Sequence, residues 1–352
     1  MIKATPLPKG TLRIKTLDLK VYEKTSDTKN TWKKSNIELL EAQEVISHFK
    51  AHDNLDFLID SKDPTFLKGC LIEGKIRGAR INVLPDGRKL DKAYSLFSPH
   101  LTLHDETSNE HWDVIYMNPN GKFAYLYTTD KKQKSVKQKY KKVLEFEKLY
   151  SLLEENVTKA LNDQKDLISL AIYTLLKTYM RVGNEIYYVT HGHKGLTTLT
   201  KKDIQIKGEN VIFNYIAKDG VPQTICEKFP KTYISRLRKL LSSLKNSDFV
   251  FNENGHPIHE IEFKKGFKKY CGKEFYPHIV RSYYATTTVK DFLKHHKTTN
   301  KKEVNELFLS IADKLGHKHF NKKHNQWELS FNVTIHHYIE PDLVEKVHQR
   351  IK

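Results

Sequence analysis

The sequence predicts an α+β protein with a small β-rich N-terminal domain and a mainly α-helical second domain that contains a three-stranded antiparallel sheet. Two observations lead to this expectation. A length of 352 residues exceeds one ordinary hydrophobic core. Strand patterns and turn signals dominate the first third of the chain, whereas apolar residues at helical spacing dominate the rest. We expect the domains to span residues 1–143 and 144–352.

The first domain reads mostly as strands. The segments HWDVIYMNP and KFAYLYTT flank Asn-Pro-Asn-Gly at residues 118–121, which is typical of a hairpin turn. One helix is expected from Ser35 to Phe49, because Ser35 and Glu38 match a capping box. Four apolar residues share one face of this helix: Ala42, Val45, Ile46 and Phe49.

A lysine-rich segment, DKKQKSVKQKYKKV, covers residues 130–143 and ends the first domain. It holds seven lysines and neither glycine nor proline. Two interpretations stay open: a solvated charged face or linker, and a basic strap that follows the phosphates of a nucleic acid. Under the second interpretation, Lys137, Lys139 and Tyr140 contact DNA.

The second domain begins with a helix from Leu167 to Met180, which Gly183 stops. The strands DIQIK, VIFNYIA and VPQTIC follow, and turns at residues 208–210 and 218–220 join them into a meander. Every later segment is expected to be helical, including Thr232 to Lys245 and Asn300 to Leu315. Asn300 and Glu303 begin the last of these helices, and Gly316 ends it.

Composition points to a polyanionic partner. Lys and Arg number 60 against 42 acidic residues, so the formal net charge is +18 and the isoelectric point is near 9.4. Such an excess favours nucleic acid as a partner through counterion release, although a merely soluble basic protein would share it. Three scattered cysteines form neither a zinc motif nor a disulfide framework, which favours a reducing compartment. No signal core or run of 18 apolar residues is present, so we expect no membrane partner.

Five polar residues fall at positions where a scaffold can hold side chains at a surface: Arg181, Lys218, Arg281, His317 and Tyr338. Each alone has an ordinary explanation, such as a helix cap, a solvated turn or a core tyrosine. Together they fit one reaction, phosphodiester transfer to a protein hydroxyl.

The chemistry requires these residue types. A tyrosine has a pKa of about 10 and must lose its proton as it attacks. The charge that develops on the phosphate oxygens needs fixed donors, and two guanidiniums and a histidine supply them. A lysine can protonate the leaving 5′-oxygen. Because these cations can replace the metal of other phosphoryl-transfer sites, and no carboxylate cluster is evident, we expect neither metal nor cofactor.

The segment RVGNEIYYVTHGHKGLTTLTKKDIQIKGENVIFNYIAKDG, at residues 181–220, resembles type IB DNA topoisomerases of the poxvirus and bacterial branch. IADKLGH and YIEPDLVEKV resemble that family's closing motifs, and GKFAYLYTTDKKQKSVKQKY is similar to its interdomain segment. The likeness covers roughly residues 113–352.

The resemblance implies a role for each residue. Arg181 and Arg281 would clamp the scissile phosphate, and Lys218 would be the general acid. His317 would donate to a phosphate oxygen, and Tyr338 would become linked to the DNA 3′ end. Supercoils would relax by strand swivelling and religation, without ATP or metal. We expect a viral-like monomer that clamps duplex DNA in an intracellular, DNA-containing compartment (cytoplasm, nucleoid, viral factory or virion), with Lys201 and His278 as further DNA contacts.

One departure from the family concerns the spacing of 21 residues between His317 and Tyr338, which is longer than in compact members. The extra stretch HFNKKHNQWELSFNV must loop out or form additional helix, and Trp327 is expected to be a packing anchor. A metal site at His317, His319 and His324 is a weaker alternative, since no cysteine or acid completes the ligand set.

Two rival functions remain. A tyrosine recombinase or integrase uses the same attack, and the segment from His278 to Arg281 reads H-x-x-R, its signature. A non-catalytic DNA-binding protein would explain the charge but would assign no role to Tyr338.

Overall fold

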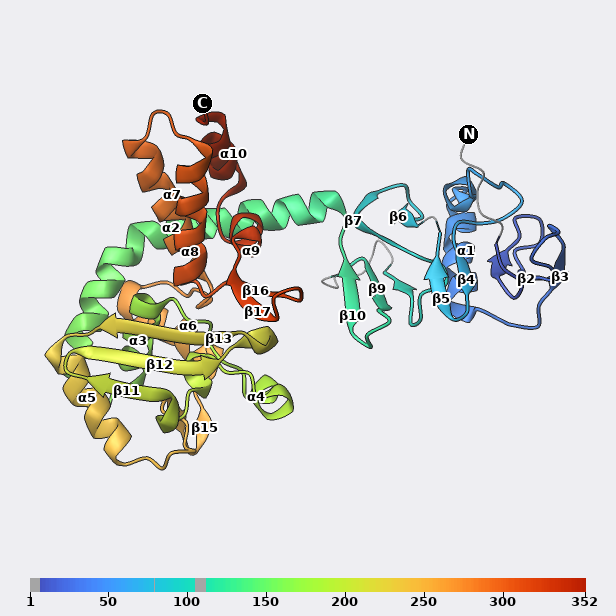
Figure 1. Cartoon of the computed structure of the whole chain (residues 1–352). Coiled ribbons are helices and arrows are strands. Elements are labelled where there is room, and N and C mark those ends of the chain that lie inside the picture. Colours follow the sequence, from blue (N-terminus) through green and yellow to red (C-terminus); the bar gives the residue numbers. More distant parts are fainter. Residues whose placement is uncertain (1–6, 79, 105–111) are drawn as a thin grey trace. The chain divides into compact units, whose positions relative to one another are not determined.

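The computed structural model describes residues 7–78, 80–104 and 112–352. The chain divides into two compact units, Met1–Gln138 and Lys139–Lys352. This division falls inside one continuous helix, α2 (Thr129–Ala160), which Figure 1 shows in green. The lysine-rich segment is therefore the first part of a helix of 32 residues.

The first unit is built from short antiparallel strands, as the sequence predicts. They form a five-stranded sheet of order β3-β2-β1-β4-β5, a three-stranded sheet of order β10-β9-β8, and the pair β6-β7. The strand bounds are β1 Leu12–Ile14, β2 Val21–Lys24, β3 Trp32–Lys34, β4 Cys70–Ile72, β5 Lys75–Arg77, β6 Ile81–Val83, β7 Lys89–Tyr94, β8 Thr102–Leu103, β9 Val114–Met117 and β10 Phe123–Leu126. The expected hairpin at residues 118–121 joins β9 to β10, with Phe123 opposite Met117; His111, quoted with that strand, lies outside the described residues.

The helix of the first unit starts later than its sequence predicts. Helix α1 spans Leu40–Ala51 and buries the four predicted apolar residues, but its N-cap is Leu39, without a side-chain cap. The capping-box prediction at Ser35 and Glu38 is wrong because Ser35 belongs to the sheet edge. Its backbone N–H donates to Val21 O, and its hydroxyl accepts from Ile37 N at 3.2 Å.

The second unit is mainly helical and holds the predicted three-stranded antiparallel sheet (Figure 1). The sheet is formed by β11 (Ile204–Lys207), β12 (Asn210–Ile216) and β13 (Pro222–Lys228). The helices are α3 Leu167–Thr178, α4 Glu185–His191, α5 Lys231–Ser242, α6 Glu260–Cys271, α7 Ile279–His295, α8 Lys301–Lys314, α9 Asn332–His337 and α10 Pro341–Gln349. The predicted capping box at Asn300 and Glu303 is confirmed, and Gly316 follows α8 at a φ of 67°.

Three predictions for this unit are corrected. Helix α3 ends at Thr178, before the predicted Met180, because Tyr179 adopts a left-handed conformation at a φ of 53°. The segments after the meander are not all helical, since β14 (Asn252–Glu253) pairs with β15 (His256–Pro257). The stretch between His317 and Tyr338 likewise forms a β-hairpin, β16 (Lys318–Asn321) and β17 (Gln326–Leu329), where a loop or helix was expected.

The hairpin forms because its aromatic residues meet across the two strands. Phe320 pairs with Trp327, and their ring centroids lie 5.4 Å apart. Such cross-strand aromatic pairs stabilise an antiparallel ladder. Trp327 is thus a packing residue, as predicted. Among the described residues, no helix is long and apolar enough to cross a membrane.

Candidate functional site

A cleft of about 420 Å³ in the second unit brings the predicted catalytic residues together. Arg181, Lys218, Arg281 and His317 line it. Tyr338 contacts two of them: its ring centroid lies 5.1 Å from the Arg281 guanidinium carbon and 4.8 Å from the His317 ring centroid. Residues that span almost half of the chain therefore meet at one place.

Arg281 is a buried cation that pairs with no acidic side chain among the residues the structure describes. It lies on α7 and is 2% exposed. Its guanidinium donates to Tyr179 O and, at 2.9 Å, to Leu315 O, which are the C-cap carbonyls of α3 and α8. The negative ends of two helix dipoles thus stabilise its charge. Burial lowers the pKa of Arg281 and contact with Tyr338 raises it, but an arginine remains protonated at neutral pH. Its buried Nε has no hydrogen-bond partner among the described residues.

Arg181 is positioned by two glycines that let chain segments touch. Its carbonyl accepts from Leu196 N at 2.8 Å. A Cβ at Gly195 would lie 2.5 Å from Arg181 O and 2.7 Å from Gly183 N, and a Cβ at Gly183 would collide with Thr198. The guanidinium itself makes no hydrogen bond or ion pair to any described side chain, so its donors face the cleft.

Lys218 sits on the tight turn between β12 and β13. Asp219 and Gly220 both have positive φ, of 65° and 78°, and Gly220 N donates to Ala217 O. This geometry presents Lys218 as an exposed side chain at the rim of the cleft, and no partner for its ammonium exists within the described part of the chain. Its charge is available to an incoming ligand.

His317 follows the turn that ends α8, and it is 6% exposed. Its Nε2 lies 3.0 Å from Arg281 Nη2, and its Nδ1 lies 2.8 Å from Thr334 Oγ1. Burial, with Arg281 and then Arg181 nearby, lowers the pKa of His317 to about 3. A side chain from the Lys218 hairpin fixes the preceding turn, because Gln223 Nε2 donates to Gly316 O at 2.8 Å.

Tyr338 is the C-cap residue of α9 and is 3% exposed. Its hydroxyl lies 3.1 Å from His278 Nε2. His278 remains exposed on its other side, yet burial of the ring, together with the nearby cations Arg281 and Arg181, lowers its pKa below the ordinary value. A neutral imidazole is therefore in position to accept the tyrosine proton.

A larger groove of about 810 Å³ adjoins this cleft within the second unit. Arg181 and Lys218 line this groove as well as the cleft, and His278 lines the groove. Lys264 adds a further cation, whereas Lys194 on the same lining pairs with Asp203 at 2.5 Å. Acidic side chains are present as well, at Glu185, Glu260 and Glu262. A basic groove that leads to a buried tyrosine is suited to a phosphate backbone.

The predicted DNA contacts occupy different environments. Lys137 is exposed on α2, and His278 lines the groove. Lys201 donates to Leu244 O at 2.8 Å, away from the cleft. Lys139 and Tyr140 contact the Tyr338 segment instead of facing outward. DNA contact by these five residues stays a prediction.

Sequence patterns did not indicate the residues that support the site. Gln223, Gly195 and Thr334 hold its parts through single contacts between segments distant in sequence. The crowding of Gly183 and Gly195 between Arg181 and Lys218 was the one available signal, because glycine permits close backbone approach.

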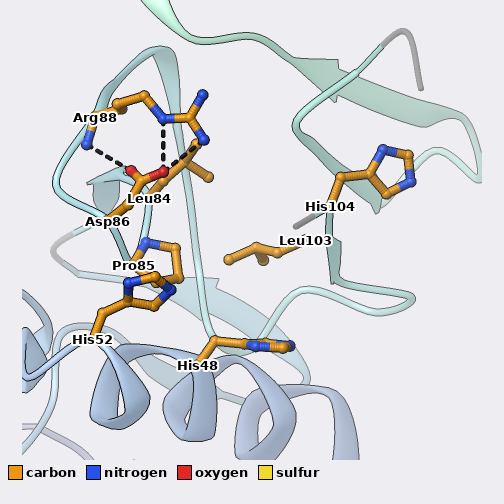
Figure 2. A pocket seen from close by; sticks show the side chains of 8 residues that line it. All are labelled: His48, His52, Leu84, Pro85, Asp86, Arg88, Leu103 and His104. Atoms are coloured by element: carbon orange, nitrogen blue, oxygen red, sulfur yellow. Dashed lines mark hydrogen bonds and ion pairs between the residues drawn. The ribbon is translucent and has the colours of Figure 1, made fainter. Parts of the chain in front are cut away.

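The histidines of the first unit do not form a comparable site. A pocket of about 50 Å³ is lined in part by His48, His52 and His104. Figure 2 shows these side chains, with Asp86 bonded to Arg88. His104 stacks on Trp112, with ring centroids 3.4 Å apart. No group of three or more histidine, cysteine or acidic side chains among the described residues could hold a metal ion. Both ring nitrogens of His317 make contacts within the protein, Nε2 with Arg281 and Nδ1 with Thr334. His319 lies 3.6 Å from Glu328.

Comparison with known proteins relates the chain to a family, a viral relative and a solved structure. Residues 128–338 match the family described as eukaryotic DNA topoisomerase I, catalytic core. The chain is 26% identical over 223 residues to DNA topoisomerase 1B of Acanthamoeba polyphaga mimivirus, a match that covers 58% of this chain and 66% of that protein. A crystal structure of XerH site-specific recombinase bound to difH substrate is similar at 17% identity and a TM-score of 0.33, over 47% of this chain and 44% of that one.

Proposed function

The chain belongs to the DNA topoisomerase I catalytic-core family, and from this premise we propose that it is a type IB topoisomerase that relaxes supercoiled double-stranded DNA. The observation that carries the proposal is the contact of one buried tyrosine, Tyr338, with Arg281, His317 and His278. These groups can activate a phenol and hold a phosphate, and the adjoining basic groove is suited to a duplex backbone.

In the proposed cleavage step, the Tyr338 oxygen attacks the scissile phosphorus. A bond forms between phosphorus and the tyrosine oxygen, and the bond to the 5′-oxygen of the DNA breaks. The phenol proton passes to His278 or to water, and Lys218 protonates the departing 5′-oxygen, which leaves as a hydroxyl. The product is a 3′-phosphotyrosyl ester and a free 5′ end.

Arginines stabilise the transition state in this scheme. Within the described part of the chain, the Arg181 guanidinium has no hydrogen-bond or ion-pair partner, and the buried Nε–H of Arg281 has no hydrogen-bond partner. Both donors suit the charge that develops on the non-bridging oxygens, because fixed donors in a dry site need no reorganisation. Since these side chains carry the positive charge of the site, we propose that neither ATP nor a divalent metal takes part.

Religation is the reverse of the same step. The phosphotyrosyl ester retains the bond energy, so the 5′-hydroxyl can attack once the broken strand has rotated and supercoils have been released. We propose that a single molecule suffices for this cycle, in a DNA-containing compartment.

The decisive test uses the purified full chain and negatively supercoiled plasmid in EDTA without ATP. Complete relaxation is expected, and detergent should trap protein on DNA. Tyr338→Phe should abolish both while leaving duplex binding intact, because only one hydroxyl is removed. Relaxation by Tyr338→Phe would overturn the mechanism.

A tyrosine recombinase remains the second candidate, because His278 of the H-x-x-R segment lies within 3.1 Å of the tyrosine hydroxyl. A recombinase exchanges strands between two paired sites. Recombination between two copies of a mapped cleavage site, without relaxation of a single plasmid, would favour it over the topoisomerase.

A further inference from the structure

Two neighbouring residues of α2 bind the chain on both sides of Tyr338. Tyr140 Oη donates to Ile339 O at 2.6 Å, and Lys139 Nζ donates to His337 O. The two acceptors are the carbonyls directly before and after the tyrosine. Almost 200 residues of sequence separate these donors from their acceptors.

The two acceptors are backbone carbonyls at the end of α9 and in the short segment that follows it, where no helical hydrogen bond is available to them. His337 is the last residue of α9, and α10 starts at Pro341. The carbonyls of His337, Tyr338 and Ile339 have no helical partners, whereas Glu340 O already accepts from Leu343 N at 3.0 Å. Side chains from other helices bind them instead, and Thr286 Oγ1 on α7 contacts the middle one, Tyr338 O, at 3.4 Å. Three consecutive carbonyls are therefore held by three side chains.

The residues themselves differ from ordinary packing residues. Tyr140 is 6% exposed, and burial raises the pKa of its hydroxyl, so it stays a proton donor. Lys139 has its ammonium 5.5 Å from the Tyr338 ring centroid. No acid pairs with it in the described part of the chain, and burial lowers its pKa to about 8. A lysine placed this way is costly unless its donors are used.

We propose that Lys139 and Tyr140 are positioning residues that hold the Tyr338 backbone in the geometry required for attack. The inference rests on the proposed function, and it assigns to these two residues a task within the protein instead of the DNA contact predicted for them. Rate is sensitive to such positioning, because a misplacement of about 1 Å can lower it by about 100-fold.

Matched variants on the same helix test the proposal. Tyr140→Phe and Lys139→Met remove the donors but keep the ring and the apolar stem. Tyr150→Phe and Lys148→Met are the controls: Tyr150 stacks on Tyr283 at 4.4 Å, and Lys148 is exposed. Neither control residue bonds to the segment around Tyr338. Lys139→Arg retains a donor and should recover part of the lost rate.

The first measurement is the rate of covalent complex formation on plasmid DNA with enzyme in excess, together with duplex affinity and thermal midpoint. We expect Tyr140→Phe and Lys139→Met to slow cleavage by about 10- to 100-fold. Affinity should stay within about twofold, and the controls should match the parent protein. Cleavage by both variants at the control rate would overturn the proposal.

The second measurement needs no activity, so it separates this inference from the proposed function. Hydrogen exchange of a peptide covering residues 332–343, in free protein, should be at least about fivefold faster in Tyr140→Phe and Lys139→Met than in the two controls. An exchange rate in that peptide equal to that of the controls would contradict the positioning role, even if the parent protein relaxes DNA. Faster exchange in a protein that never cleaves DNA would sink the proposed function instead.

Discussion

Arg281 Nη2 lies 3.0 Å from Nε2 of His317. A guanidinium can only donate, so this imidazole nitrogen is the acceptor and the ring proton resides on Nδ1, which faces Thr334 Oγ1 at 2.8 Å. In this arrangement His317 is neutral and cannot donate from Nε2. Its predicted donation to a phosphate oxygen requires that the contact with Arg281 be exchanged when the phosphate arrives.

Acidification should destabilise the protein through His317. The folded pKa of about 3 lies below the ordinary value of 6.5. The unfolded chain therefore binds the extra proton first, and stability present above pH 6.5 is lost as pH falls toward the folded pKa. Between pH 7 and pH 5 this histidine should account for up to about 2 kcal/mol of the free energy of unfolding.

Chemical denaturation at both pH values measures that loss. His317→Asn should show a smaller difference between pH 7 and pH 5 than His324→Asn, because His324 is exposed. Equal differences in the two variants would mean that His317 titrates normally in the folded protein.

The two arginines should separate activity from stability. Arg181→Ala should lower the cleavage rate by about 100-fold or more and change the free energy of unfolding by less than about 0.5 kcal/mol. Arg281→Ala should also lower the rate, but it leaves Tyr179 O and Leu315 O unpaired and should cost about 3 kcal/mol or more. Urea titrations with parallel cleavage assays check both expectations, and equal stability of the two variants would contradict the burial argument.

Gly195→Ala should damage the site through the backbone. Its new Cβ would lie 2.5 Å from Arg181 O and 2.7 Å from Gly183 N, which cannot yield without moving Arg181. We expect a loss of about 1–3 kcal/mol and slower cleavage. Gly266→Ala is the matched control, because its Cβ also meets close neighbours, at 2.6 Å and 2.9 Å, but these are side-chain carbons of Ile172 and Ile168 and not the backbone of Arg181. Normal cleavage by Gly195→Ala would refute this account of how Arg181 is held.

Lys218→Ala should slow cleavage by about 10²- to 10⁴-fold without loss of stability, because the residue is exposed. A substrate with sulfur at the 5′-bridging position of a mapped site tests the assigned role. A thiolate leaves without protonation, since the pKa of a thiol is near 8.5. The variant and the parent protein should then cleave at similar rates; a persistent defect would assign Lys218 to another task.

Local patterns were sufficient for much of the fold. Turn residues at 208–210 and 218–220 specified the meander, and Asn300 with Glu303 specified the start of α8, because each signal lies within a few residues. Ser35 and Glu38 carried an equally good cap pattern, but pairing of Ser35 N with Val21 O prevailed. The hairpin β16-β17 was not predicted, because its many lysines and histidines obscure the apolar alternation that marks a strand. The pairing of Phe320 with Trp327 becomes evident only in the structure.

The site could be predicted by residue type but not by supporting contact. The sequence places the five candidate residues at or near the ends of predicted helices and strands: Arg181, Lys218, Arg281, His317 and Tyr338. The bond between Tyr140 and Ile339, by contrast, joins residues 199 positions apart and has no local signature. Long-range hydrogen bonds of this kind depend on how helices pack, which periodicity alone does not specify.

The hydrogen bonds to the segment between α9 and α10 have a consequence for religation of the proposed phosphotyrosyl intermediate. If Lys139 and Tyr140 have the proposed positioning role, Tyr338 is ordered before any substrate arrives, so the ordering entropy is lost once, during folding, and is absent from each turnover. An ester formed on such a rigid residue would be presented to the returning strand end in the same orientation in which it was made. Religation would then require no conformational search by the tyrosine. The lifetime of the broken strand would be set by rotation of the free 5′ end.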